Sequence, residues 1–164
     1  MDLTGDMVRI LAELEAGEVE FIVIGGVAAV LQAVPVVTMD VDIVHRRTPE
    51  NIDRLIAVLA GLEAHYWPDP GRRRLPPRAD DLVGQGHILL QTRLGRLDVL
   101  CEISGERGYE ELLPHTVSIE EESLRLRVLD LPTLALVKTE SGRPKDRLVV
   151  PLIIATHEER KKRG

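Results

Sequence analysis

The apolar residues of this chain alternate between helical and strand spacing, which indicates an α+β fold. A helix is expected from Thr4, which can cap its start, to Gly17, which can end it. A continuous apolar run then predicts a buried strand over residues 19–24, and a small apolar helix follows over about 27–33. The expected buried stripe of the first helix consists of Met7, Ile10, Leu11 and Leu14.

The same alternation continues through the rest of the chain. A strand over 38–44 precedes a helix that begins at Thr48-Pro49-Glu50, where a cap, a proline and an acid stand in the order that favours a helix start. Residues 67–81 are rich in Pro, Gly and Arg, and predict a long irregular loop. The later expected elements are strands over 87–92, 96–101, 116–119 and 124–129, and helices over 109–113, 132–138 and 145–163.

This order predicts a small mixed β-sheet covered by helices. The length of 164 residues suits one compact domain, residues 1–164, with a core over about 19–101 and C-terminal helices over about 131–163.

Composition narrows the classes of partner. Hydrophobic residues make up 44% of the chain, which is enough for an ordinary core, but only four residues are aromatic. A surface on which nucleic-acid bases stack is therefore not expected. The net charge of −6 also argues against attraction to a phosphate backbone as a whole. The basic loop from Arg72 to Arg78 is a local exception that could overhang a site.

Other chemistry has little support in the sequence. Cys101 is the single cysteine, so an intrachain disulfide or a thiolate metal cluster is excluded, and its apolar neighbours predict a buried side chain. The five histidines lack the spacing of metal ligands, and His45 is expected at the surface. With no signal-peptide core and no apolar run that could span a membrane, a cytoplasmic protein is expected.

Two acidic residues stand in the strand expected over 38–44. Asp40 and Asp42 are two positions apart, so both should project from one face, while Met39, Val41 and Ile43 should point into a core. Two carboxylates among apolar neighbours repel each other unless a cation lies between them. A hard divalent ion with oxygen ligands would meet this need. The alternative is an exposed strand face with two ordinary acids.

A third carboxylate, Asp98, stands alone in a later apolar strand. A salt bridge to Arg93 or Arg96 would explain it if it stood by itself. A neighbouring strand that placed it beside Asp42 would instead complete a site of three carboxylates for a metal, and with Asp40 and Asp42 present we favour this second interpretation.

The glycine pair Gly25-Gly26 lies between the first buried strand and the following helix. Glycine at such a junction lets the backbone approach a ligand closely, and the start of the helix offers free N–H groups to a phosphate. Many strand-to-helix junctions use glycine for geometry alone, so this alternative stays open.

Together these residues resemble the DNA-polymerase-beta-like nucleotidyltransferase superfamily. The pattern consists of Gly25-Gly26, the run Thr38-x-Asp40-x-Asp42, and Asp98 on a later strand. Within that superfamily the chain looks most similar to the small bacterial nucleotidyltransferases of the toxin–antitoxin and phage-defence class and their uncharacterised relatives. The resemblance covers about residues 19–101, and extends more loosely to residues 138–146.

The resemblance implies a set of roles at one site. Asp40 and Asp42 would hold two magnesium ions that bridge the triphosphate of an incoming nucleotide, and Asp98 would bind one of them and help to activate the acceptor hydroxyl. Gly25 and Gly26 would let the triphosphate lie against the start of the helix.

Further residues would contact the phosphates. Thr38, where serine is commoner in the superfamily, would donate a hydrogen bond to a phosphate oxygen. Lys138, Arg143 and Lys145 would neutralise phosphate charge, although a solvated helix end explains these three equally well. Asp146 is expected to cap the last helix or to pair with a base.

The function implied is a magnesium-dependent transfer of a nucleoside monophosphate from a nucleoside triphosphate such as ATP to an acceptor hydroxyl. A protein side chain or a small molecule is favoured as acceptor over a tRNA end, because the chain is acidic and poor in aromatic residues. The alternative is a catalytically inactive module of the same fold that binds a partner protein. A metal-dependent phosphohydrolase that uses the same carboxylates is a weaker third possibility.

Overall fold

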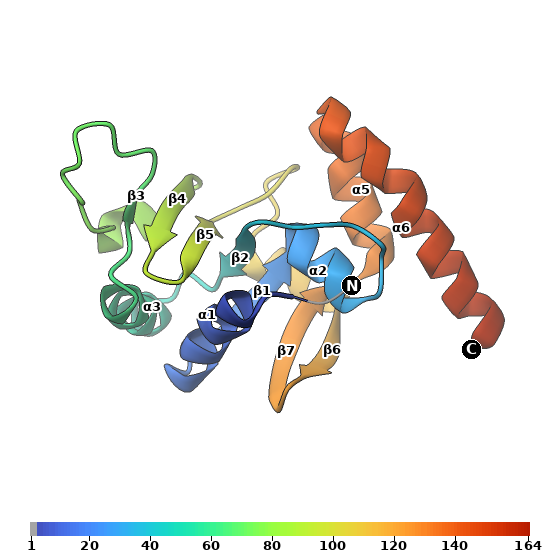
Figure 1. The fold of residues 1–164 in the computed structure, drawn as a ribbon, viewed down its shortest axis with the longest axis horizontal. Coiled ribbons are helices and arrows are strands. Elements are labelled where there is room, and N and C mark those ends of the chain that lie inside the picture. Colours follow the sequence, from blue (N-terminus) through green and yellow to red (C-terminus); the bar gives the residue numbers. More distant parts are fainter. Residues whose placement is uncertain (1–2) are drawn as a thin grey trace.

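A single mixed sheet of seven strands organises the protein, in the spatial order β3-β4-β5-β2-β1-β7-β6 (Figure 1). The computed structural model describes residues 3–164. The strands are β1 (Phe21–Ile24), β2 (Val41–His45), β3 (His65–Tyr66), β4 (His87–Thr92), β5 (Gly95–Leu100), β6 (Thr116–Glu121) and β7 (Leu124–Leu129). The helices are α1 (Gly5–Ala16), α2 (Gly25–Leu31), α3 (Pro49–Gly61), α4 (Tyr109–Leu112), α5 (Leu131–Ser141) and α6 (Pro144–Arg163), with short 3₁₀ turns η1 (Ala79–Leu82) and η2 (Leu113–His115).

Parallel and antiparallel pairs are combined in this sheet. Strand β2 runs parallel to β5 and antiparallel to β1, and β1 in turn runs parallel to β7. The hairpins β4–β5 and β6–β7 are antiparallel, as is the pair β3–β4. The α+β class and the mixed sheet covered by helices are therefore confirmed.

The helices start where the sequence predicts a cap. The hydroxyl of Thr4 accepts a hydrogen bond of 3.2 Å from the backbone N–H of Met7, and the hydroxyl of Thr48 accepts one of 3.3 Å from that of Asn51. The apolar stripes of α1 and α3 are buried in the same core as the inward residues of the central strands. These inward residues include Val41, Ile43, Leu97 and Val99.

The strand expected over 38–44 instead covers Val41–His45, and this shift corrects the predictions for one side chain before it and one at its end. Val41 is the first residue that pairs with β5, so Met39 lies outside the sheet and is 79% exposed rather than in a core. His45 is fully buried rather than on the surface. It shares the inward face with Val41 and Ile43, and its Nε2 lies 2.8 Å from the carbonyl oxygen of Leu82.

The segment after α3 contains a strand that the sequence pattern did not predict. The two-residue strand β3 pairs with β4, and two backbone hydrogen bonds extend this edge: Tyr66 donates to the carbonyl of Leu75, and Trp67 donates to that of Leu89. From Trp67 onward the chain forms the long irregular loop that was expected, up to η1.

Helices α5 and α6 pack against each other, and α6 extends away from the sheet (Figure 1). Pro151 lies inside α6, which continues through it. Several apolar side chains of α6 are exposed, among them Leu148, Leu152 and Ile154. Within residues 3–164, no helix is long and apolar enough to cross a membrane.

The core face of β5 gives a direct test of this architecture. We expect Leu97→Ala to lower the free energy of unfolding by about 2–5 kcal/mol, because its side chain is fully buried beneath the sheet. The matched variant Leu148→Ala on α6, where the side chain is 77% exposed, should change it by less than about 0.5 kcal/mol. Urea denaturation followed by circular dichroism measures both, and equal losses would contradict the assigned core.

Candidate functional site

Two carboxylates face each other at the centre of the sheet. Asp42 on β2 and Asp98 on β5 are direct partners in the parallel pairing, so their side chains project from the same face. The pairing continues to Ile24 on β1 and to Leu89 on β4, which gives a row of four residues across four strands. The sheet register therefore brings together two of the three acids that the sequence singled out.

The third acid, Asp40, lies at a bend just before β2 and is partly buried. Its negative charge helps to raise the pKa of both Asp42 and Asp98. As the side chains lie, no three acidic, histidine or cysteine side chains among residues 3–164 form a group that could hold a metal ion. Asp40, Asp42 and Asp98 would have to draw closer together to share one.

The electrostatics of the pair are unfavourable without a cation. Burial, the charge of Asp98 and the charge of Asp40 raise the pKa of Asp42 from 3.8 to about 7, and the charge of Lys138 opposes this only in part. Burial also raises the pKa of Asp98, although a salt bridge from Arg96 lowers it. Crowded carboxylate oxygens that lack sufficient positive charge are the donor set that a hard divalent ion binds, so the chemistry of these residues suits such an ion, although their spacing does not yet form a site for one.

Asp98 also has the arginine partner that was considered as the alternative explanation for it. The Nη2 of Arg96 lies 2.9 Å from Oδ1 of Asp98, and both side chains are mostly buried. Arg93, the other arginine considered, instead donates to the carbonyl of Gly61. Asp98 therefore has both neighbours at once, the carboxylate of Asp42 and the guanidinium of Arg96.

The glycine pair leaves room for the side chains of the site. Gly25 has a positive φ of 67°, and a Cβ added there would lie 2.3 Å from Oδ2 of Asp42. A Cβ added at Gly26 would lie 2.4 Å from the hydroxyl oxygen of Thr38. That hydroxyl donates a 3.1 Å hydrogen bond to the carbonyl of Asp40. The two glycines are thus required by the packing of Thr38 and Asp42 against the start of α2.

Opposite the carboxylates, Asp146 gathers basic groups at the junction of α5 and α6. Its carboxylate pairs with Nζ of Lys138 at 3.3 Å and with Nε of Arg143 at 2.9 Å, and Ser141 donates to it through its hydroxyl. Burial raises the pKa of Asp146, but the Ser141 hydrogen bond and the two positive charges outweigh it, so the pKa lies below the ordinary value. Asp146 therefore pairs with bases, one of its two expected roles. Lys145 is exposed.

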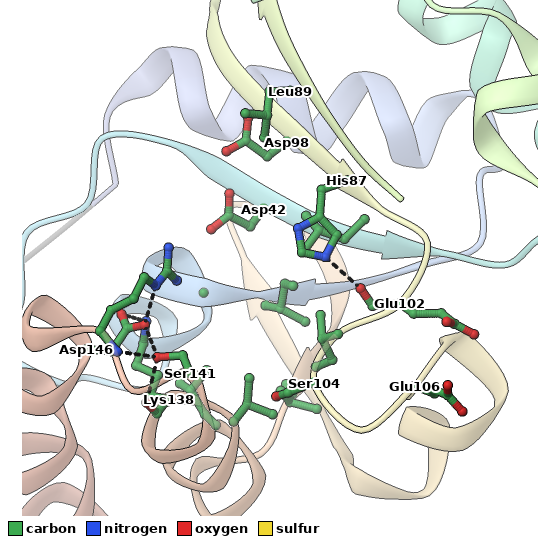
Figure 2. A pocket seen from close by; sticks show the side chains of 18 of the residues that line it. Asp42, His87, Leu89, Asp98, Glu102, Ser104, Glu106, Lys138, Ser141 and Asp146 are labelled. Carbon is green, nitrogen blue, oxygen red and sulfur yellow. Dashed lines mark hydrogen bonds and ion pairs between the residues drawn. The ribbon is translucent and has the colours of Figure 1, made fainter. Parts of the chain in front are cut away.

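Two cavities meet at the carboxylates. The larger, about 630 Å³, lies over the outward face of β4 and β5 and extends to α5 (Figure 2). The smaller, about 270 Å³, lies between the start of α2, the segment before β2, and α6. Both are lined by Asp42, Asp98, Lys138, Arg143 and Asp146.

The remaining predicted residues divide between these cavities. Gly25 lines the larger one, whereas the smaller one is lined by Gly26, Thr38, Asp40 and Lys145. All nine site residues expected from the sequence thus line one or both of these two neighbouring cavities, which together form the hollow of the site.

Several residues of the hollow were not singled out from the sequence. His87 and Leu89 on β4 project into the larger cavity beside Asp98, and Nε2 of His87 lies 3.0 Å from the carbonyl oxygen of Glu102 (Figure 2). The alternation of buried and exposed residues along β4 carries a signal for them, because it places both on the face opposite Ile88 and Leu90. That this face adjoins Asp98 depends on the register of β4 with β5, which the alternation does not determine.

Comparison with known proteins identifies the fold. No protein-family model matches the chain, and no curated protein matches it in sequence. Among solved structures it is similar to TM1012 of Thermotoga maritima, a candidate nucleotidyltransferase, with a TM-score of 0.57 and 14% identity over 88% of each chain.

It is also similar to the antibiotic-resistance factor ANT(2″)-Ia. The solution structure of that protein gives a TM-score of 0.56 and 12% identity, over 96% of this chain and 90% of that one. Its crystal structure in complex with adenylyl-2″-tobramycin gives 0.58 and 14%, over 96% and 92%. At these identities the likeness establishes a nucleotidyltransferase fold for this chain.

The raised pKa of Asp42 makes stability depend on pH. The folded protein binds this proton more tightly than the unfolded chain does, so in EDTA the free energy of unfolding should fall as the pH rises from about 4 through about 7. We expect Asp42→Asn to remove most of this fall and to be more stable than the wild type at pH 8 by about 1–3 kcal/mol. Asp80→Asn, at an exposed position of η1, is the control. Denaturant unfolding at pH 5 and pH 8 measures this difference in stability. A wild type that is more stable at pH 8 than at pH 5 would contradict a raised pKa of Asp42.

The close fit of Gly25 against Asp42 predicts an unequal effect of two alanine substitutions. Gly25→Ala should cost about 2–4 kcal/mol, because it combines a left-handed backbone with a collision at Asp42. Gly5→Ala in the first turn of α1, where nothing lies within 4 Å of the added Cβ, should be neutral or slightly stabilising, within about 1 kcal/mol. Thermal melts measure both variants; similar melting temperatures would show that Gly25 is not constrained.

Proposed function

We propose that this protein is a divalent-metal-dependent nucleotidyltransferase, which moves a nucleoside monophosphate from a nucleoside triphosphate to an acceptor hydroxyl. One observation carries the proposal: the in-register pair Asp42 and Asp98 lies where two cavities meet, opposite the basic cluster of Lys138 and Arg143. The nucleotidyltransferase fold supports it. We also propose that residues 1–164 act as one such domain, since one sheet includes strands from both halves of the chain.

The triphosphate is assigned to the smaller cavity. Lys138, Arg143 and Lys145 line it and supply positive charge, of which Asp146 offsets one unit. The hydroxyl of Thr38 also borders this cavity and can donate to a phosphate oxygen when it releases the carbonyl of Asp40. Gly26 also lines this cavity, and its lack of a side chain leaves room for Thr38 at the start of α2.

Asp40, Asp42 and Asp98 would hold Mg²⁺, with two ions expected. When bound, the ions would neutralise the charge of the triphosphate and favour ionisation of the acceptor hydroxyl. The protein's own part is to hold three carboxylates at the boundary between the cavities. The raised pKa of Asp42 accords with this role, because it reflects a buried carboxylate beside two other acids whose charge Lys138 offsets only in part.

The acceptor is assigned to the larger cavity, on the Asp98 side. Asp98 would accept the proton of the acceptor hydroxyl. The hydroxyl oxygen then bonds to the α-phosphorus, while the bond between the α-phosphorus and the α–β bridging oxygen breaks and pyrophosphate leaves. Lys138 and Arg143 would stabilise the negative charge that develops on the leaving group. Because both cavities share Asp98, donor and acceptor can approach from opposite sides.

A small molecule is the acceptor class that these features favour. A cavity of about 630 Å³ has the size of sites that enclose small ligands. ANT(2″)-Ia, which shares the fold, has been crystallised with adenylyl-2″-tobramycin, a nucleotide joined to a small molecule. A protein side chain is the second choice, and the net charge of −6 places a tRNA end below both.

A binding module without catalysis is the second candidate. The exposed apolar side chains of Leu148, Leu152 and Ile154 on α6 favour it, because such residues are common where a partner protein docks. In this case the partner would be a protein, such as the cognate member of a toxin–antitoxin pair, and the carboxylates would have no reaction to serve.

Labelled nucleotides separate these candidates. In the presence of Mg²⁺ and mixed hydroxyl-bearing acceptors, we expect the wild type to transfer label from at least one NTP and to release pyrophosphate. Asp42→Asn and Asp98→Asn should each lower the rate at least about 100-fold while remaining folded. Asp80→Asn, on the exposed turn η1, should retain the rate.

Two outcomes contradict the proposal. Titration calorimetry that finds no Mg²⁺-dependent nucleotide binding leaves the partner-binding module. Phosphate release without labelling of any acceptor, lost in the same two variants, assigns the carboxylates to hydrolysis instead.

A further inference from the structure

We infer that Arg96, held by the ring of Trp67, is a positioning residue for Asp98. It fixes one oxygen of this carboxylate and balances part of the charge of the three acids. The inference rests on the proposed function, because Asp98 is there assigned to the acceptor hydroxyl. It concerns residues that neither the sequence motif nor the shared fold assigns to the site.

The guanidinium of Arg96 is bound on three sides. Its Nη2 donates to Oδ1 of Asp98 at 2.9 Å, and its Nε donates to the carbonyl oxygen of Leu90 at 3.2 Å. Its Cζ lies 3.8 Å from the centroid of the Trp67 ring. A guanidinium that stacks on an aromatic face and donates in two directions has little freedom to rotate.

Trp67 is itself fixed to the edge of the sheet. Its backbone N–H donates to the carbonyl of Leu89, which lies in the same row as Asp98 and Asp42. Trp67 is 43% exposed, so its indole is not buried in the core, and its ring stacks on the guanidinium of Arg96. Trp67, at the start of the long loop, is thus linked to Asp98 through the side chain of Arg96.

This arrangement divides the two oxygens of Asp98. The guanidinium of Arg96 donates its hydrogen bond to Oδ1 and not to Oδ2. A carboxylate held at one oxygen keeps a single orientation, so the second oxygen can meet the acceptor hydroxyl without first losing rotational freedom. When both groups are ionised, an unrestrained Asp98 would instead turn away from Asp42, since the two charges repel.

The charge of Arg96 has a second, separable effect. It reduces the negative potential of Asp40, Asp42 and Asp98, and so weakens their attraction for a divalent cation. The two effects therefore appear in two different measurements. Loss of the charge of Arg96 should strengthen cation binding, and loss of its positioning of Asp98 should slow nucleotidyl transfer. A salt bridge that only stabilised the fold would not produce this split.

Arg96→Gln tests both effects. With Mn²⁺ as the probe, measured by calorimetry or by the electron spin resonance of free Mn²⁺, we expect binding to tighten about 3–10-fold because one nearby positive charge is gone. In the transferase assay we expect kcat to fall about 10–100-fold and KM for the NTP to stay within about twofold, because the misplaced group lies on the acceptor side. Weaker Mn²⁺ binding, or an unchanged kcat, overturns the inference.

Two conservative variants separate charge from geometry. Arg96→Lys keeps the charge but loses the planar fork, so Mn²⁺ affinity should stay within about twofold while kcat falls about 3–10-fold. Trp67→Leu should have a similar effect on kcat, because it removes the stack and leaves the arginine in place. Arg54→Gln, which removes an exposed positive charge from α3, should alter neither quantity. If Trp67→Leu and Arg96→Lys both match the wild type, the positioning role is wrong.

Failure of the proposed function is distinguishable from failure of this inference. If the wild type transfers no nucleotide to any acceptor, the proposed function fails, but the Mn²⁺ measurement still decides on the link between Arg96 and the acids. Tighter binding in Arg96→Gln then retains that link, and unchanged binding removes it. If Arg96→Gln does not fold, Arg96→Lys and Trp67→Leu carry the test.

Discussion

Repulsion between Asp42 and Asp98 is the constraint around which the rest of the site is arranged. The two carboxylates are side by side because β2 and β5 pair in register, and this pairing is held by the apolar residues on the opposite face, such as Ile43 and Val99. A slip of one residue would bury the acids and expose the core, so the register cannot relax to relieve the repulsion. Burial of the hydrophobic face thus maintains an unfavourable contact on the polar face, which is common at functional sites.

The predictable part of this arrangement is the part that depends on local pattern. The alternation of apolar and acidic residues places Asp42 and Asp98 on outward faces, and capping residues locate the starts of α1 and α3. The same alternation, extended one step, would have placed His45 on the inward face with Ile43. The polarity of histidine suggests the surface, but its position in the strand decides that it is buried. Met39 shows the opposite case: its hydrophobicity suggests a core position, but it precedes the first residue of β2 and is exposed.

What could not be predicted depends on contacts between segments far apart in the sequence. The parallel pairing of β2 with β5 joins residues 56 positions apart at Asp42 and Asp98, and nothing in either segment specifies that register alone. Trp67 reaches Arg96 only because a strand of two residues pairs with β4, and so short a strand leaves no periodic signal. The two cavities are set by how α5 and α6 lie over the sheet, which also depends on the assembled fold.

The positively charged side chains are distributed unequally around the acids, so the two sides of the site differ in charge. Arg96 lies on the side of β4 and is already committed to Asp98, whereas Lys138 and Arg143 lie across the hollow and share a single carboxylate, that of Asp146. Two positive charges against one negative charge therefore lie toward α5 and α6, the side to which the phosphates of the donor are assigned in the proposal. The side of β4 has the larger cavity, which His87, Leu89 and the acidic residues Glu102 and Glu106 line. In the proposed reaction the anionic donor would bind on the basic side and the acceptor on the other. The sheet register that opposes Asp42 and Asp98 places both acids where the two cavities meet.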